Sequence, residues 1–165
     1  MGPLVSSAGW RAIFGPVMDL TLPLADPAAT DALGAALARR ARPGDALLLS
    51  GPLGAGKSAL ARAFLRALAE DPALEVPSPT FTLVQEYRWA GGRAAHFDLW
   101  RLHGPADLAE LGWDEAREGI VLVEWPDRLG DQAPSGALRV DLALADPGRI
   151  AVLSGWAGRL GGLGA

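Results

Sequence analysis

The feature that most constrains this 165-residue chain is the run of residues 51–58, which reads GPLGAGKS and fits the pattern G-x-x-x-x-G-K-[S/T] in full. It follows the continuous apolar run 46–49, which is typical of a strand buried on both faces of a parallel sheet. A helix is expected to follow from about Ser58 to Glu70. A strand, a glycine-rich turn and a helix in this order present backbone N–H groups and a helix N-terminus to an anion. The sequence therefore predicts a phosphate-binding loop.

The residues of this loop have expected roles in holding a nucleotide. The glycines let backbone N–H groups approach phosphate oxygens, because a Cβ would obstruct them. Lys57 is expected to reach the β- and γ-phosphates, and the Ser58 hydroxyl to ligate Mg²⁺. Lys57 is also the chain's single lysine, so no second lysine is available for the segment with which GTPases usually read guanine. ATP is therefore favoured over GTP. The nucleotide contacts expected from the loop and the residue that follows it are Gly51, Gly54, Ala55, Gly56, Lys57, Ser58 and Ala59.

Composition limits the other kinds of chemistry. The chain has no cysteine, which excludes disulfides, zinc–thiolate sites and thiol catalysis. Its formal net charge is -4 and it has no basic run, whereas proteins that bind RNA alone usually show a basic face. We therefore expect any role with nucleic acid to work through a partner protein. No apolar run approaches the length of a membrane span, and a cytoplasmic location is expected.

The order of apolar and helical segments predicts an α/β fold with a single P-loop NTPase-like domain. We expect a mixed, mostly parallel central sheet flanked by helices, with a β-hairpin and antiparallel C-terminal strands. The expected strands are 17–24, 46–49, 81–87, 94–102, 120–123, 138–143 and 149–154, and the expected helices are 27–41, 58–70 and 105–111. The domain is assigned to residues 17–156, between a disordered or misassigned extension at 1–16 and a flexible tail at 157–165.

Two further positions carry side chains suited to nucleotide chemistry. Glu124 ends the apolar strand 120–123, where a carboxylate can hold Mg²⁺ directly or through water, although Asp is the usual residue there. The alternative is a strand-terminal surface acid. Thr80 follows a proline, so its hydroxyl is expected to project stiffly and to sense phosphate or water. Here the alternative is an ordinary turn.

The run 96–102, which reads HFDLWRL, is expected to alternate between two faces of a strand. Phe97 and Leu99 would face one side, and His96, Asp98 and Trp100 the other. Asp98 would then hold the metal shell or orient the attacking water, unless this is a solvated hairpin face. His96 alone is interpreted as structural.

Together these segments resemble the TsaE family. That family shows a glycine-rich loop ending in G-A-G-K-T, then S-P-T-[FY], then H-F-D-x-Y-R-L, and then a strand ending in E-W-P. In this chain the corresponding runs are 54–58, 78–81, 96–102 and 124–126, and the resemblance covers about residues 22–154. The three later motifs in this order are much more specific than the phosphate loop alone.

The resemblance implies a Mg²⁺-dependent ATPase that joins a TsaB–TsaD pair and supports threonylcarbamoyl transfer to the adenosine beside the tRNA anticodon. It implies Mg²⁺ ligation by Ser58 and Glu124, and catalytic roles for Asp98, Thr80 and Glu124. Trp125 is implied in nucleotide handling, and the segment 26–30 is expected to border the adenine. Two other readings stay open, a small-molecule kinase and a nucleotide-gated binding module that needs no hydrolysis.

The chain departs from the family pattern at four positions. Ser58 and Ala59 stand where threonines are usual; Ser58 keeps the hydroxyl, and Ala59 loses one possible contact to the α-phosphate. Pro52 replaces a common Asp, and Trp100 replaces the usual Tyr and its phenol hydrogen bond. None of these removes a group that the chemistry strictly requires.

The tryptophans near the expected site are candidates for a partner-docking face, because tryptophan is enriched in binding hot spots. They are Trp100, Trp113 and Trp125, each with a core position as its alternative.

Overall fold

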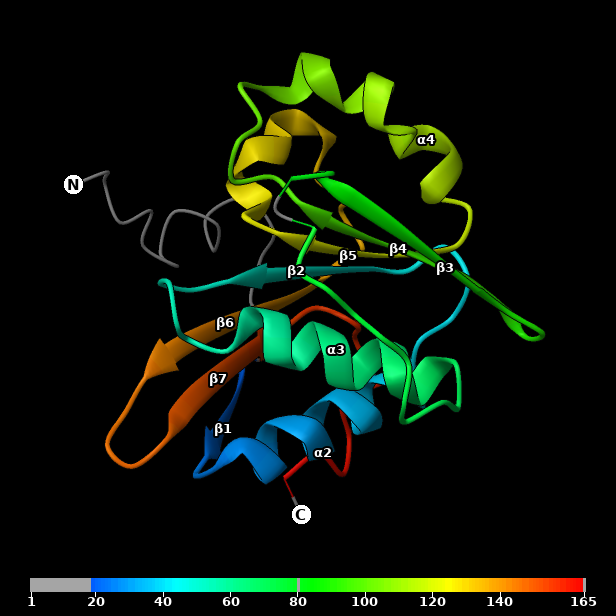
Figure 1. Cartoon of the computed structure of the whole chain (residues 1–165). Coiled ribbons are helices and arrows are strands. Elements are labelled where there is room, and N and C mark those ends of the chain that lie inside the picture. Colours follow the sequence, from blue (N-terminus) through cyan, green and yellow to red (C-terminus); the bar gives the residue numbers. More distant parts are fainter. Residues whose placement is uncertain (1–18, 80, 165) are drawn as a thin grey trace.

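The computed structural model describes residues 19–79 and 81–164 of the chain. The extension expected at 1–16, the first two residues of the strand expected at 17–24, and Thr80 therefore lie outside the described residues. In the part described, helices and strands alternate as one α/β unit (Figure 1).

Seven strands form one sheet in the order β1-β7-β6-β2-β5-β4-β3. The central strands β6, β2, β5 and β4 pair in parallel, whereas β3 is antiparallel to β4, and β7 is antiparallel to both β6 and β1. The predicted mixed, mostly parallel sheet with a hairpin and antiparallel C-terminal strands is therefore confirmed. The strands are β1 Leu20–Leu24, β2 Ala46–Ser50, β3 Val84–Trp89, β4 Gly92–Asp98, β5 Ile120–Glu124, β6 Leu138–Leu144 and β7 Arg149–Ser154.

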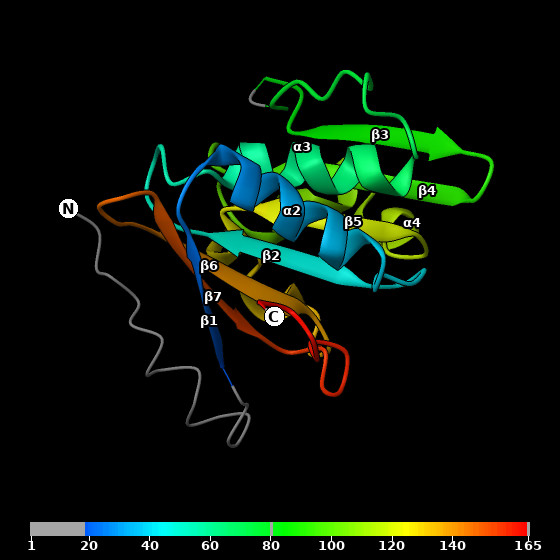
Figure 2. The ribbon, with the colours of Figure 1, turned by 90° about the horizontal axis from the view of Figure 1, so that it is seen from below.

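Helices cover both faces of the sheet (Figures 1 and 2). Helices α2 (Pro27–Ala38) and α3 (Lys57–Leu68) lie on one face, and the 3₁₀ helices η1 (Pro105–Leu111) and η2 (Pro126–Gln132) lie with α4 (Trp113–Ala116) on the other. Because side chains alternate along a strand, the buried residues form two clusters. Leu47 and Leu122 belong to the cluster that includes α2 and α3 side chains, and Leu48 and Val123 to the other. No helix among the described residues is long and apolar enough to cross a membrane.

The first helix begins as the sequence predicts and ends three residues early. The Asp26 side chain accepts a hydrogen bond from the Ala29 N–H at 2.8 Å, and Pro27 occupies the first turn. The helix was expected to reach Ala41. After Ala38 the backbone changes to a 3₁₀-type hydrogen bond, in which the Arg40 N–H donates to the Leu37 carbonyl three residues earlier. This tighter turn ends the α-helix.

The bounds predicted for the two hairpin strands were wrong. β3 begins at Val84 rather than at residue 81, because Leu83 has a φ of 63° and its N–H closes a turn onto the Pro79 carbonyl at 2.8 Å. β4 ends at Asp98 rather than at residue 102. There the Asp98 Oδ1 accepts a bond from the Trp100 N–H at 3.1 Å, so the chain turns away from the sheet. Trp100 therefore does not share a strand face with Asp98.

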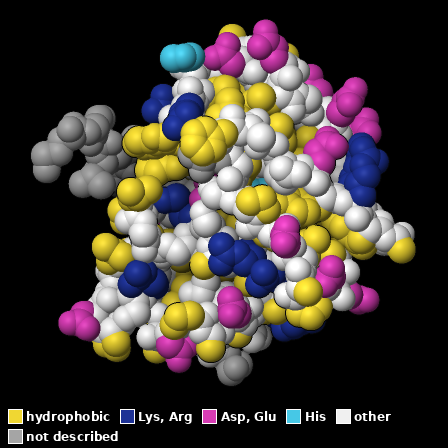
Figure 3. Space-filling model, in the orientation of Figure 1, with side chains coloured by type: hydrophobic (Ala, Val, Ile, Leu, Met, Phe, Trp, Pro, Cys, Tyr) yellow, Lys and Arg dark blue, Asp and Glu magenta, His cyan; other side chains and the backbone are white. Residues whose placement is uncertain are grey.

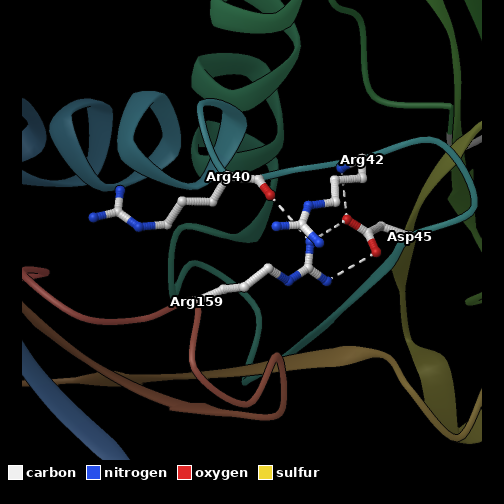
Figure 4. A network of polar contacts seen from close by, with 4 residues as sticks. All are labelled: Arg40, Arg42, Asp45 and Arg159. Atoms are coloured by element: carbon white, nitrogen blue, oxygen red, sulfur yellow. Dashed lines mark hydrogen bonds and ion pairs between the residues drawn. The ribbon is translucent and has the colours of Figure 1, made fainter.

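Residues 157–165 were expected to form a flexible tail, but Arg159 in this segment makes specific contacts with the rest of the domain. The Arg159 guanidinium pairs with both carboxylate oxygens of Asp45, at 2.8 and 2.9 Å, and donates to the Arg40 carbonyl at 3.0 Å (Figure 4). It also lies 4.1 Å from the ring centroid of Trp156, which is buried. These contacts join the C-terminal segment to the residues just before β2.

Candidate functional site

The candidate site lies where three parallel strands end side by side. β2 leads into the glycine-rich loop, β5 ends at Glu124, and β4 ends at Asp98. In the sheet register Glu124 is opposite Leu49 on one side and Asp98 on the other. The crevice at the carboxyl ends of parallel strands is the usual place for a ligand in an open α/β sheet. The structure thus brings the sequence-predicted loop and both carboxylates to one edge.

The loop conformation requires glycine. Gly51, Gly54 and Gly56 have φ values of 141°, 79° and 102°, a region that residues with a side chain rarely adopt. At Gly51 a Cβ would also collide with the Leu142 carbonyl oxygen. Helix α3 then starts at Lys57 without a side-chain cap, so the N–H groups of its first turn have no partner within the helix. These are the groups that a phosphate would use.

Lys57 is enclosed at the base of the loop. It is 6% exposed, and its Nζ donates to the Gly51 and Pro52 carbonyls at 2.6 and 3.1 Å. The ammonium also lies 4.4 Å from the ring centroid of Trp125. Burial lowers the pKa of Lys57, while the charges of Glu124 and Asp98 act to raise it. The Lys57 ammonium therefore lies next to the place where the loop N–H groups would bind a phosphate.

Ser58 and Glu124, the two residues expected to ligate Mg²⁺, are in contact with each other. The Ser58 hydroxyl donates to Glu124 Oε1 at 3.1 Å, although the two residues are 66 positions apart in the chain. The other carboxylate oxygen, Oε2, lies 2.7 Å from Nε2 of His96. Among the described residues no three His, Asp or Glu side chains gather into a metal site by themselves. The Ser58 hydroxyl oxygen and Glu124 Oε1 nevertheless suit Mg²⁺. This ion prefers oxygen ligands and completes its shell with water and substrate phosphates.

Asp98 is the second buried carboxylate at this edge. It is 7% exposed, and burial raises its pKa, an effect that the Trp100 backbone hydrogen bond opposes. The neighbouring charge of Glu124 raises the pKa further, whereas His96 and Lys57 lower it. Two carboxylates and one ammonium thus share this edge, and a cation between the carboxylates would be favoured electrostatically.

Aromatic and apolar side chains surround the loop. Trp125 has a φ of 60°, unusual for a residue with a side chain, and its ring lies 4.4 Å from that of Trp100. Leu53 of the loop and Trp100 are exposed large apolar residues, at 86% and 53%, and Phe81, which lies against Arg101, is 85% exposed. Trp113 is different: it is 2% exposed and packs edge-on against Phe97. Trp113 is therefore a core residue, which was the alternative to a docking role, and it is not part of a docking face.

A cavity of about 640 Å³ adjoins the loop between the starts of α2 and α3. Its walls include Asp26, Pro27 and Thr30, from the segment expected to border the adenine, and Ala59 of the loop helix. Arg149 also lines it and donates to the Gly54 carbonyl at 3.1 Å. Side chains in dark blue, the colour of Lys and Arg, are visible over α3 in Figure 3. Sequence reasoning missed Arg149, because nothing near it in the chain indicates that β7 starts beside the loop.

Comparison with known proteins gives one consistent family. The family model "Threonylcarbamoyl adenosine biosynthesis protein TsaE" matches residues 24–150. A curated relative from Rickettsia felis, named tRNA threonylcarbamoyladenosine biosynthesis protein TsaE, is 34% identical over 71% of this chain and 68% of its own. A protein of the same name from Synechocystis is 41% identical over 72% and 75%. The crystal structure of YdiB from Bacillus subtilis superposes with a TM-score of 0.69 at 26% identity, covering 88% and 90% of the two chains.

Proposed function

Because this chain belongs to the TsaE family, we propose that it is a Mg²⁺-dependent ATPase that serves the biosynthesis of threonylcarbamoyladenosine in tRNA. The observation that carries the proposal is the meeting of Lys57, Ser58 and Glu124 at the loop. Lys57 supplies a positive charge for the phosphates, and Ser58 and Glu124 supply two oxygens that can bind a metal. This is the minimal set for binding a nucleoside triphosphate with its metal.

The chain's own groups account for triphosphate binding. The N–H groups of the loop and of the first turn of α3 hold the phosphate oxygens. Lys57 exchanges its two loop carbonyls for phosphate oxygens, which accept its N–H groups more strongly because they are charged. Ser58 and Glu124 would hold Mg²⁺, and the ion would supply positive charge to neutralise the phosphate oxygens. Asp98, buried opposite Glu124, orients the attacking water.

The nucleoside lies in the cavity next to the loop. Ala59 forms part of its wall immediately after Ser58, so the cavity continues from the phosphate position along α3. The segment 26–30 closes it from the side of α2. A volume of about 640 Å³ falls in the range typical of small-molecule sites. Adenosine is the occupant because the chain has no second lysine for a GTPase-type guanine reader.

The partners are a TsaB–TsaD pair, with tRNA reached only through that complex. The net charge of -4 disfavours direct binding to a polyanion. Leu53 of the loop and Trp100, whose ring packs on Trp125 beside Lys57, form an exposed apolar rim at the loop. A partner seated on this rim would exclude water from the nucleotide and add positioning groups. We therefore expect slow turnover by the free protein and faster turnover in the complex.

The test is phosphate release from ATP by the wild type, by Lys57→Ala and by Arg88→Ala, each with and without the TsaB–TsaD pair. Arg88 is an exposed cation in β3, away from the loop, and serves as the matched control. Wild type and Arg88→Ala should be stimulated by the pair, and Lys57→Ala should not. Phosphate released should equal ATP consumed without any added acceptor; a shortfall would indicate a kinase. If a non-hydrolysable ATP analogue still supported tRNA modification, a nucleotide-gated binding module would replace the ATPase.

A further inference from the structure

His96 is a buried polar residue to which the function proposed above gives no role. It lies within β4, is 1% exposed, and has its Nε2 2.7 Å from Glu124 Oε2. Its other ring nitrogen, Nδ1, has no hydrogen-bond partner among the residues that the structure describes. Burial of a polar ring is costly unless it is hydrogen-bonded. The contact with Glu124 is therefore the polar interaction that offsets the burial of this ring.

The contact fixes the orientation of the Glu124 carboxylate. A carboxylate that is held at one oxygen can rotate, because its terminal torsion is only weakly restricted. Glu124 is held at both oxygens: Oε1 accepts from Ser58, and Oε2 faces His96. An ionised carboxylate only accepts hydrogen bonds, so Nε2 of His96 carries the proton. The two contacts together set the plane of the carboxylate and direct Oε1 towards Ser58.

We propose that His96 is the positioning residue for Glu124, holding Oε2 so that Oε1 stays beside the Ser58 hydroxyl. The proposal rests on the proposed function, because it concerns the carboxylate assigned there to Mg²⁺. The register of the sheet makes it possible: Glu124 lies opposite Asp98, and His96 is two residues before Asp98 on the same face of β4. Partners that orient metal ligands typically contribute 10–100-fold to metal affinity or activity.

The test compares His96→Leu, His96→Gln and His96→Asn with the same changes at His103, the chain's other histidine, which is exposed. The readouts are ADP affinity by calorimetry, in Mg²⁺ and in EDTA, and Mn²⁺ affinity of the ADP complex by electron paramagnetic resonance. His96→Leu should lose about tenfold or more of the metal-dependent gain in affinity. Its affinity in EDTA should be unchanged, which a general structural defect would not produce. His96→Gln, whose amide can occupy the Nε2 position, should keep most of the gain.

The possible results separate the two proposals. If the wild type shows no metal-dependent gain, the proposed function is overturned, and the positioning role with it. If the wild type shows the gain and His96→Leu keeps all of it, only the positioning role is overturned. Should His96→Leu fail to fold, the pair His96→Gln and His96→Asn decides, because the Asn amide is too short to reach Oε2. A gain kept by Gln and lost by Asn supports the role, and equal behaviour of the two overturns it.

Discussion

The contact between Arg159 and Asp45 should make a measurable contribution to the free energy of unfolding. Arg159 lies in a glycine-rich segment, a composition that is typical of a flexible tail. Arg159 makes two charge-assisted hydrogen bonds to Asp45 and one hydrogen bond to the Arg40 carbonyl (Figure 4). It also lies over the Trp156 ring. Charge-assisted bonds contribute about 1.5–3 kcal/mol each when shielded and exposed ion pairs about 0–1 kcal/mol. The Arg159 and Asp45 side chains are 19% and 14% exposed, between these limits. We therefore expect Arg159→Gln to lower the free energy of unfolding by about 1–3 kcal/mol.

The assay is thermal unfolding by circular dichroism at moderate salt. For a chain of this size each kcal/mol corresponds to roughly 2–4 °C in Tm. The matched control is Arg88→Gln, since the Arg88–Glu86 pair is 3.8 Å long and its side chains are 69% and 64% exposed. That variant should melt close to the wild type. Asp45→Asn combined with Arg159→Gln should cost less than the sum of the single changes. If Arg159→Gln melts with the control, the contact contributes nothing and the reasoning from shielding is wrong.

Four further results are expected from the site. Lys57→Ala should weaken ATP binding by about a hundredfold, because it removes charge-assisted contacts of about 1.5–3 kcal/mol each; equal affinity by calorimetry would contradict this. GTP should displace labelled ATP much less effectively than cold ATP does, and equal potency would refute the preference. Glu124→Ala and Asp98→Ala should reduce turnover in the presence of the partner pair more than they reduce ATP affinity, because metal contacts made in the transition state mainly affect rate; normal hydrolysis by both would show that the site is wrongly assigned. The protein alone should not shift labelled tRNA in an electrophoretic assay, and a tight, salt-sensitive shift would exclude a purely indirect contact with tRNA.

Contacts between residues close in sequence were predictable. The phosphate loop follows from eight consecutive residues, because the φ values of its glycines and the start of α3 are local properties. The buried strands β2 and β5 were recognisable as apolar runs for the same reason. Prediction failed at the end of β4, where one local and one long-range contact interrupt the pattern. The alternation after Asp98 reads as a continuing strand, but the Asp98 side chain bonds the Trp100 N–H and the Leu99 N–H donates to the Glu124 carbonyl.

By itself, the sequence determined that this chain has a phosphate loop, a mixed α/β sheet, two carboxylates suited to the loop, and the family's motifs. Only the tertiary structure decided which side chains meet. His96 and Glu124 are 28 positions apart, Gly54 and Arg149 are 95 apart, and Asp45 and Arg159 are 114 apart. The physical reason is that apolar burial drives strands together without specifying which atoms touch. Strand order and register then place these side chains within hydrogen-bonding distance, and both depend on the packing of the whole sheet.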